Sequence, residues 1–244
     1  MGLRLDKVLL SRGLVGTRSR ARDLIVRGAV AVDGAVETKP GALVQEDAPI
    51  VLLEDADYVS RGSLKLIAAL DAFGFDPAGR HALDVGASTG GFTEVLLRRG
   101  AAHVVAVDVG HGQLHPKLAG DPRVTHHEGR DARTLTQADV RTPVEAVVAD
   151  VSFISLEKAL PAALALASPG AWLVALIKPQ FEAGRDAVGK GGIVRDAAVR
   201  DAQAEKIAVW IAGHAGWRVA GLIPSPVVGG SGNQEFLIGA MLDG

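Results

Sequence analysis

The stretch Ala82–Phe92, ALDVGASTGGF, joins a short apolar segment to a glycine-rich turn, and a helical pattern follows at Thr93–Arg99. This order predicts a strand, a tight turn and a helix. The first N–H groups of such a helix, with its positive dipole end, favour a polar or anionic ligand beside the turn. Residues 86–91 lack the second glycine of the G-x-G-x-x-G fingerprint, which weakens the case for NAD.

An acidic residue follows each of the next two predicted strands. Asp108 ends the apolar run 104–107, where a carboxylate can accept hydrogen bonds from both hydroxyls of a ribose. Asp131 lies where a further strand would end, and could contact an adenine amino group. The pattern therefore predicts a nucleoside-containing ligand.

Apolar strand patterns at 82–85, 104–107, 146–149 and 171–177 alternate with helical stretches. This alternation predicts an α/β domain with a mostly parallel sheet covered by helices on both faces. The last two patterns, 217–224 and 235–241, flank a Pro/Gly/Ser-rich loop and predict a closing antiparallel hairpin.

A smaller α+β unit is expected before this domain. Residues 5–10 predict a short helix, Ser19 is expected to cap a second one, and 30–36 predicts a hairpin around Asp33 and Gly34. A further strand is expected at 50–53. We expect domains at 1–57 and 63–244, joined by a linker at 58–62.

The 244 residues carry a net charge of −2 and no cysteine, which excludes disulfides, thiolate metal sites and a cysteine nucleophile. No apolar run is long enough to span a bilayer, and the histidine spacing gives no convincing metal site, so we expect a cytoplasmic protein without a metal. Residues 1–28 hold seven Arg or Lys residues against two Asp residues, a local charge of +5. Such a patch is an electrostatic footprint that the whole-chain charge conceals.

Strand, D-x-G-x-x-x-G-G and a following acid together resemble the S-adenosylmethionine pocket of Rossmann-like methyltransferases. The resemblance implies that this cofactor, with S-adenosylhomocysteine as product, contacts a set of residues on the turn and the two following strands: Asp84, Gly86, Ala87, Ser88, Thr89, Gly90, Gly91, Phe92, Asp108 and Asp131.

Two further strand ends indicate the methyl acceptor. Asp150 lacks the Pro-Pro-aromatic sequence that usually follows in amino-methylating enzymes, and carbon-5 pyrimidine methylation generally needs a cysteine. Lys178 ends the next strand, where an ammonium held by a carboxylate suits a sugar hydroxyl because it stabilises the developing alkoxide.

The order Lys65, Asp150, Lys178 and Glu235 resembles the K-D-K-E tetrad of FtsJ/RrmJ-like ribose 2′-O-methyltransferases. More closely, the whole chain resembles the TlyA-type (haemolysin A) ribosomal RNA methyltransferases, in stretches that include RLDKVL, LDVGASTGGFTEVLL, IKPQFEAGR and GNQEFL. The resemblance implies methylation of a cytidine ribose in ribosomal RNA, with no obligate protein partner. It also implies that Lys178 activates the hydroxyl, that Asp150 and Glu235 orient Lys178, and that Lys65 assists.

The N-terminal stretch resembles an S4 RNA-binding domain, which implies phosphate contacts from Arg4, Arg18, Arg20, Arg22 and Arg27. One departure from the family pattern is Ser63, where a second glycine is expected beside Lys65. Three other functions stay open: a non-catalytic RNA-binding or ribosome-assembly protein, a NAD(P)-dependent oxidoreductase and, last, a membrane-lytic protein.

Overall fold

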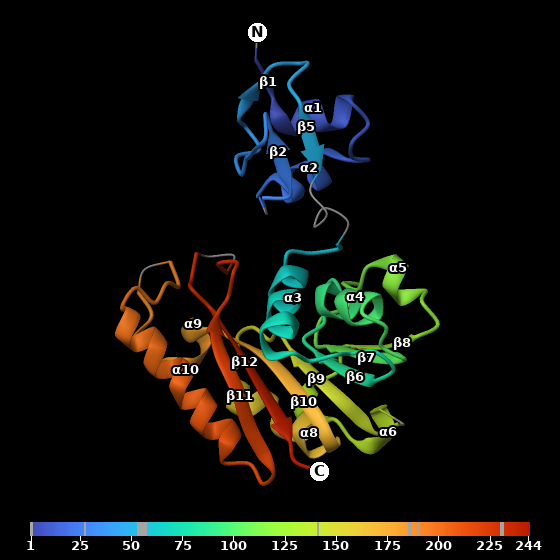
Figure 1. Ribbon diagram of the computed structural model, residues 1–244, viewed down its shortest axis with the longest axis vertical. Coiled ribbons are helices and arrows are strands. Elements are labelled where there is room, and N and C mark those ends of the chain that lie inside the picture. Colours follow the sequence, from blue (N-terminus) through green and yellow to red (C-terminus); the bar gives the residue numbers. More distant parts are fainter. Residues whose placement is uncertain are drawn as a thin grey trace. The chain divides into compact units, whose positions relative to one another are not determined.

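The computed structural model describes residues 2–26, 28–52, 58–140, 142–184, 187–189, 191–229 and 232–244 (Figure 1). The chain separates into two compact units, Met1–Tyr58 and Val59–Gly244. The expected linker falls at this division, with Tyr58 grouped in the first unit and residues 59–62 in the second.

The first unit combines short helices and short strands around its own core, with Leu5, Leu9, Leu24 and Ile25 among the most buried side chains. Its described elements are β1 (Leu3–Arg4), α1 (Leu5–Ser11), α2 (Arg18–Val26), β2 (Val30–Val32), β3 (Ala35–Val36), β4 (Leu43–Val44) and β5 (Ile50–Leu52). The strands form a β1–β4 pair and a sheet in the order β3-β2-β5.

The β2–β3 hairpin turns at Asp33 and Gly34, whose φ angles are 51° and 80°. Positive φ at both central residues is the combination that favours Asp-Gly in two-residue hairpins, so the expected turn is confirmed. The start of α2 differs from the expectation. The helix begins at Arg18, and Thr17 Oγ1 accepts a hydrogen bond from the Arg20 N–H at 3.2 Å. Thr17 therefore takes the capping role expected of Ser19.

The second unit is a seven-stranded sheet with helices on both faces, as expected. Its described elements are α3 (Gly62–Phe73), β6 (His81–Val85), α4 (Gly91–Arg98), β7 (His103–Asp108), α5 (Pro116–Ala119), β8 (Val124–Glu128), the 3₁₀ helix η2 (Ala132–Thr134), α6 (Gln137–Val140), β9 (Val144–Ala149), α7 (Leu156–Ala159), α8 (Pro161–Ala165), β10 (Ala167–Ile177), α9 (Pro179–Glu182), α10 (Ala197–Ala212), β11 (Trp217–Pro224) and β12 (Phe236–Leu242).

The strand order is β11-β12-β10-β9-β6-β7-β8. The strands from β10 to β8 run parallel, while β12 is antiparallel to both β10 and β11. The parallel sheet and its closing hairpin are thus confirmed. Among the described residues, no helix combines the length and apolarity needed to cross a membrane.

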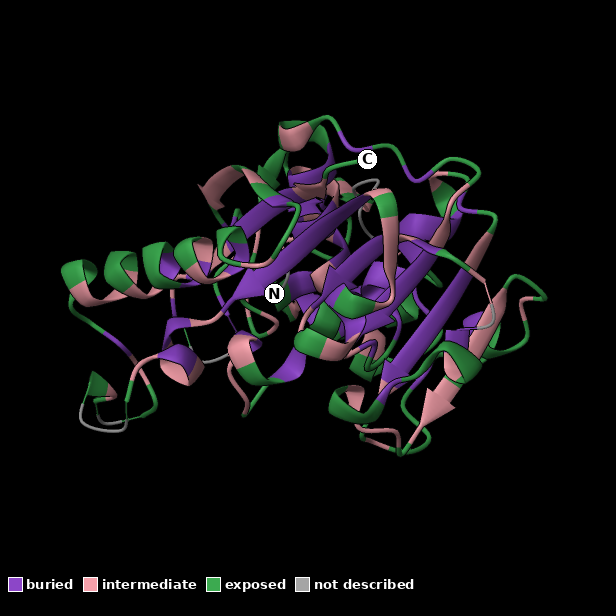
Figure 2. Ribbon diagram, turned by 90° about the horizontal axis from the view of Figure 1, so that it is seen from below, coloured by how far each residue is buried: buried purple, intermediate pink, exposed green. Residues whose placement is uncertain are grey.

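The central strands are buried on both faces, as their near-continuous apolar sequence requires (Figure 2). One face packs against α7, α8 and α10, with Leu160 and Ile207 in the core. On the other face Phe75, which follows α3, stacks on Trp172 of β10 with ring centroids 5.4 Å apart.

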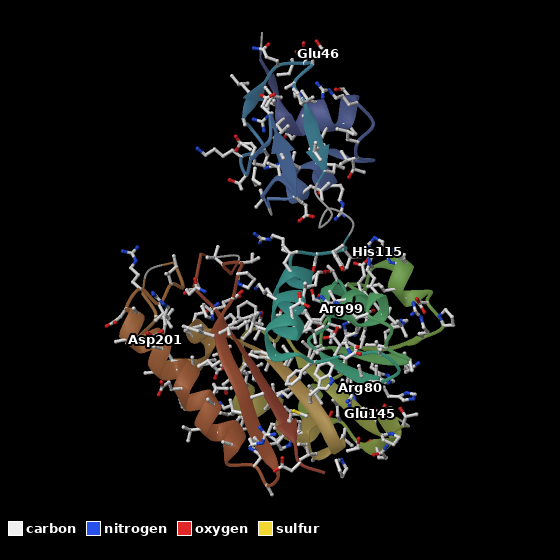
Figure 3. All side chains as sticks on the ribbon, in the orientation of Figure 1. Glu46, Arg80, Arg99, His115, Glu145 and Asp201 are labelled. Atoms are coloured by element: carbon white, nitrogen blue, oxygen red, sulfur yellow. The ribbon has the colours of Figure 1, made fainter. Side chains whose placement is uncertain are left out.

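Hydrogen bonds join the amino end of β6 to that of β9 (Figure 3). Arg80 Nη1 donates to the Glu145 carbonyl oxygen at 3.2 Å, and the Glu145 side chain accepts from the His81 N–H at 2.9 Å. The opposite edge of the sheet, at the carboxyl ends of these strands, carries the residues that the sequence singles out.

Candidate active site

The glycine turn after β6 lies directly against the end of β9. A Cβ atom at Gly86 would stand 2.6 Å from the backbone oxygen of Asp150, and the Gly86 φ is +83°. Only glycine satisfies both conditions. Gly90, with φ +95°, forms the N-cap of α4, where a Cβ would overlap Leu118 and stand 2.8 Å from Leu114 Cδ1.

Asp84 lies beneath this turn and has no exposed surface. Thr93 Oγ1 donates to its Oδ2 at 2.6 Å, and burial raises the pKa of Asp84 to about 7. A carboxyl group enclosed in this way supports the turn from below. The structure therefore does not bring Asp84 to a ligand surface, unlike the expected cofactor contact.

An open cavity of about 370 Å³ lies beside the turn. Its described lining comes from the carboxyl ends of β6, β7 and β9, from the segments that follow these strands and β8, and from α7: Val85, Gly86, Ser88, Val107, Asp108, Val109, Gly110, Gln113, Arg130, Asp131, Ala132, Arg133, Asp150, Val151, Ser152, Phe153, Ile154 and Ala159. The crevice beyond the carboxyl ends of parallel strands is where open α/β sheets bind ligands.

Asp108 is held rigidly in this lining. Its two carboxylate oxygens accept backbone hydrogen bonds from Ser88 at 2.8 Å and from Gly110 at 2.7 Å. Each carboxylate oxygen has a second lone pair, so the group retains capacity for a ligand's hydroxyl groups.

Asp131 begins the 3₁₀ helix η2, where its side chain accepts from the Arg133 N–H at 2.9 Å. Hydrogen bonds from the Arg133 side chain, more than any other interaction, lower the pKa of Asp131 to about 2. The carboxyl is therefore an ionised acceptor at neutral pH. The strand before it, β8, ends three positions earlier than Asp131, at Glu128.

The remaining expected cofactor residues lie around the turn and outside this lining: Ala87, Thr89, Gly90, Gly91 and Phe92. Gly91 and Phe92 are buried in the first turn of α4. The sequence interpretation missed Gln113, whose Oε1 accepts from Ser88 Oγ at 3.1 Å. Its position in the loop after Asp108, at the same sheet edge, was the available signal.

Lys178 and Asp150 meet because they follow neighbouring parallel strands, β10 and β9. Lys178 Nζ approaches Asp150 Oδ1 at 2.6 Å, and their side chains are only 12% and 23% exposed. The two atoms form an ion pair without the alignment of a hydrogen bond. Lys178 donates its hydrogen bond to Ser152 Oγ at 2.8 Å. One carboxylate and one hydroxyl therefore fix the ammonium at the cavity edge.

Glu235 has a different partner from the expected one. The β10–β12 register pairs Ile177 with Phe236, so that Lys178 and Glu235 each lie one residue beyond it. The Glu235 carboxylate nevertheless turns to Lys65, whose Nζ donates to Oε2 at 2.5 Å, in a pair that is 10% and 3% exposed. The expectation that both acids orient Lys178 is therefore wrong for Glu235: the tetrad is built as two Lys–carboxylate pairs.

The turn and the helix that carries Lys65 are joined at Ser63. The Ser63 hydroxyl is fully buried and donates to the Gly91 carbonyl oxygen at 3.0 Å. A Cβ at position 91 would stand 3.2 Å from the Ser63 backbone nitrogen. The departure from the family pattern at position 63 thus adds a hydrogen bond between the start of α3 and the start of α4.

The expected RNA-binding arginines of the first unit differ in their surroundings. Arg4 and Arg18 both form ion pairs with Asp6, each at 3.0 Å. Arg20 forms an ion pair with Asp23 at 3.3 Å, and Arg22 is exposed on α2. Arg27 lies outside the described residues.

Comparison with known proteins agrees with this division of the chain. Residues 58–241 match the FtsJ-like methyltransferase family, and residues 3–50 match the S4 domain. The chain is 47% identical to the 16S/23S rRNA (cytidine-2′-O)-methyltransferase TlyA of Mycobacterium tuberculosis, over 96% of this chain and 88% of that protein. It is 39% identical to Hemolysin A of Brachyspira hyodysenteriae, over 96% of this chain and 98% of that one.

A solved structure agrees with the similarity to Hemolysin A. A hemolysin-like structure from Streptococcus thermophilus superimposes with a TM-score of 0.75 and 39% identity, covering 99% of this chain and 89% of the other. The chain therefore belongs to the FtsJ-like methyltransferase family, in the TlyA and hemolysin A group, and it joins an S4 domain to the methyltransferase domain.

Proposed function

We propose that this enzyme transfers a methyl group from S-adenosylmethionine to the ribose 2′-hydroxyl of a cytidine in ribosomal RNA. The observation that carries the proposal is the double role of Asp150. This residue lines the cavity beside the glycine turn, and its carboxylate pairs with Lys178. A ligand in the cavity and an acceptor beside the ammonium would therefore meet at one residue.

The cavity suits S-adenosylmethionine in size and in chemistry. Its volume of about 370 Å³ lies within the range of roughly 300–1,000 Å³ that is usual for small-molecule sites. The apolar Val85 and Val107 line part of it, while the carboxylates of Asp108 and Asp131 supply acceptors for ribose hydroxyls and an adenine amino group. The bound cofactor supplies an electrophilic methyl group on a sulfonium centre.

The chain's own contribution to the reaction is electrostatic. A neutral sugar hydroxyl is a weak nucleophile, and an ammonium beside its oxygen stabilises the negative charge that develops as the O–H bond weakens and the proton passes to water. Asp150 and Ser152 hold Lys178 in one direction, so this stabilisation needs little rearrangement during the reaction. The acceptor oxygen must also be held in line with the transferred group, which close positioning by both ligand sites supplies.

Lys65 assists at the acceptor or its phosphate, and Glu235 positions Lys65. The burial of Glu235 favours a fixed geometry for the pair, and the 10% of the Lys65 side chain that is exposed is the part open to an acceptor. The arginines of the S4 unit bind RNA phosphates, which gives affinity and register with little base discrimination. On this proposal the physiological substrate is a ribosomal subunit or its precursor RNA.

The test is transfer of a labelled methyl group to unmodified ribosomal subunits by wild type, Lys178→Ala and Lys158→Ala. Lys158 is an exposed lysine on α7 and serves as the matched control. Removing a pre-organised electrostatic group typically costs about 10²–10³ in turnover. We expect a loss of that size for Lys178→Ala, near wild-type turnover for Lys158→Ala, and unchanged binding of S-adenosylhomocysteine by calorimetry.

Mapping of the 2′-O-methyl mark on the product RNA completes the test. Wild-type turnover by Lys178→Ala would refute the assigned mechanism. Binding of ribosomal RNA by the wild-type protein without any methyl transfer would identify a non-catalytic RNA-binding protein instead.

A further inference from the structure

Asp6 is a fully buried carboxylate on the first turn of α1, and two arginines enclose it. Arg4 Nε donates to Asp6 Oδ1 at 3.0 Å, and Arg4 Nη2 donates to Oδ2 at 3.1 Å. Arg18 Nε donates to the same Oδ2 at 3.0 Å. One carboxylate therefore brings together two guanidinium groups, one from β1 and one from the start of α2.

The two arginines keep donors for a ligand. Arg18 uses only Nε on Asp6, and Arg4 uses Nε and Nη2. The Arg4 and Arg18 side chains are 42% and 48% exposed, whereas Asp6 is inaccessible. Arg4 Nη1 stands 3.2 Å from the position that a Cβ would take at Gly41, so the backbone there leaves room for this guanidinium.

The cluster carries a net positive charge. Hydrogen bonds from Arg4, followed by those from Arg18, lower the pKa of Asp6 despite its burial, so the carboxylate is ionised at neutral pH. Two cations and one anion leave one positive charge, and the cations are the exposed members. Arg22 adds a further exposed cation one helical turn beyond Arg18, on the same face of α2.

We propose that Asp6 is a positioning residue for RNA binding by the S4 unit, because it fixes how the Arg4 and Arg18 guanidinium groups meet a backbone phosphate. Guanidinium groups bind phosphate through paired N–H donors of fixed geometry, so their direction decides how well they bind. Asp6 never touches the phosphate. It holds two like charges close together and leaves Arg4 Nη1 and both Nη groups of Arg18 unused by the carboxylate. This inference rests on the proposed RNA-binding function of the S4 unit.

Charge alone and positioning predict opposite results for Asp6→Asn. The substitution adds one positive charge to the unit, and on charge alone RNA binding becomes tighter. If Asp6 positions the arginines, binding becomes weaker because two mutually repelling guanidinium groups lose their common acceptor. Asp33→Asn is the matched control, since it changes the charge equally on an exposed hairpin turn whose φ of 51° suits asparagine.

The experiment measures binding of unmodified, protein-free ribosomal RNA to the full chain at several salt concentrations, together with KM and kcat for methyl transfer. For Asp6→Asn we expect about tenfold weaker binding and a salt dependence reduced by about one phosphate contact. KM for RNA rises in proportion, while kcat at saturating RNA and affinity for S-adenosylhomocysteine stay within twofold of wild type. Asp33→Asn binds as tightly as wild type or more so.

Arg18→Lys keeps the charge, removes the paired donors and serves as a second variant if Asp6→Asn unfolds the unit by circular dichroism. We expect Arg18→Lys to weaken RNA binding at least fivefold. The proposal is overturned if a folded Asp6→Asn variant matches Asp33→Asn, or if Arg18→Lys binds as wild type does. Absence of RNA binding by the wild-type chain would instead refute the proposed function itself.

Discussion

Replacing Glu235 by Gln leaves the Lys65 ammonium enclosed beside a neutral amide. The wild-type pair is joined at 2.5 Å, with only 10% of the Lys65 side chain and 3% of the Glu235 side chain exposed. Water therefore cannot replace the missing charge without opening the structure. The perturbation separates the contribution of this pair to stability from its contribution to catalysis.

The expected loss follows from burial. Removing one partner of a buried ion pair costs about 3–5 kcal/mol, because the other charge stays desolvated and uncompensated. The residual exposure of Lys65 favours the lower end, about 3 kcal/mol. With a urea dependence of about 3 kcal/mol per molar for a unit of this size, the midpoint of unfolding falls by about 1 M.

A double variant tests the cause of this loss. The double variant Lys65→Met with Glu235→Gln carries no charge at either position of the pair, so we expect it to recover most of the stability lost by either single variant. All three variants lose methyl transfer if the pair acts at the acceptor. Tryptophan fluorescence reports on the methyltransferase unit alone, because Trp172, Trp210 and Trp217 all lie within it.

Two results would contradict this reasoning. If Glu235→Gln unfolds at the wild-type urea concentration, the pair is far better solvated than its burial indicates. If the double variant is as unstable as the sum of the two single variants, the loss comes from packing and hydrogen bonds other than the charge pairing. Recovery of stability together with recovery of turnover would assign the pair a purely structural role.

Gly90→Ala should weaken S-adenosylhomocysteine binding at least tenfold by calorimetry, because a Cβ there overlaps Leu118 and the φ of +95° is strained for alanine; wild-type affinity would show that the turn adapts. Asp84 has a pKa raised by burial from 3.8 to about 7, so its contribution to stability is complete below about pH 4 and is lost as the pH rises through about 7. Asp84→Asn removes this dependence, and its urea midpoint relative to wild type should therefore increase between about pH 5 and pH 8; a constant difference would contradict the raised pKa.

The sequence was sufficient to predict which strand ends of the large sheet carry the polar residues of the site. Asp108, Asp150 and Lys178 each follow a strongly apolar run, and parallel strands bring their carboxyl ends to one edge. The glycines of the turn were equally predictable, because Gly86 and Gly90 both need positive φ and close approach. The apolar pattern of the strands and the backbone conformation of the turn decide these features, and both depend on the local sequence.

The pairing within the tetrad was not predictable in the same way. Adjacency in the β10–β12 register places Glu235 beside Lys178, which is the contact that the family resemblance implied. Side-chain direction decides otherwise, since Glu235 turns to Lys65 on α3. A helix that packs across a sheet end is positioned by its whole apolar face, and no short motif encodes where one of its lysines will point.

The positive charge of the S4 unit was predictable from the sequence, but the differences among its arginines were not. A basic stretch predicts electrostatic affinity from composition alone, and this treats every arginine as an equivalent surface charge. The structure makes them unequal, because Asp6 takes one or two donors from each of Arg4 and Arg18 and fixes what remains. A buried acid within a basic patch lowers the net charge of the patch but fixes the directions of its N–H donors. Phosphate binding depends on the geometry of paired N–H donors, so we expect fixed donor directions to contribute more to phosphate affinity than one added positive charge does.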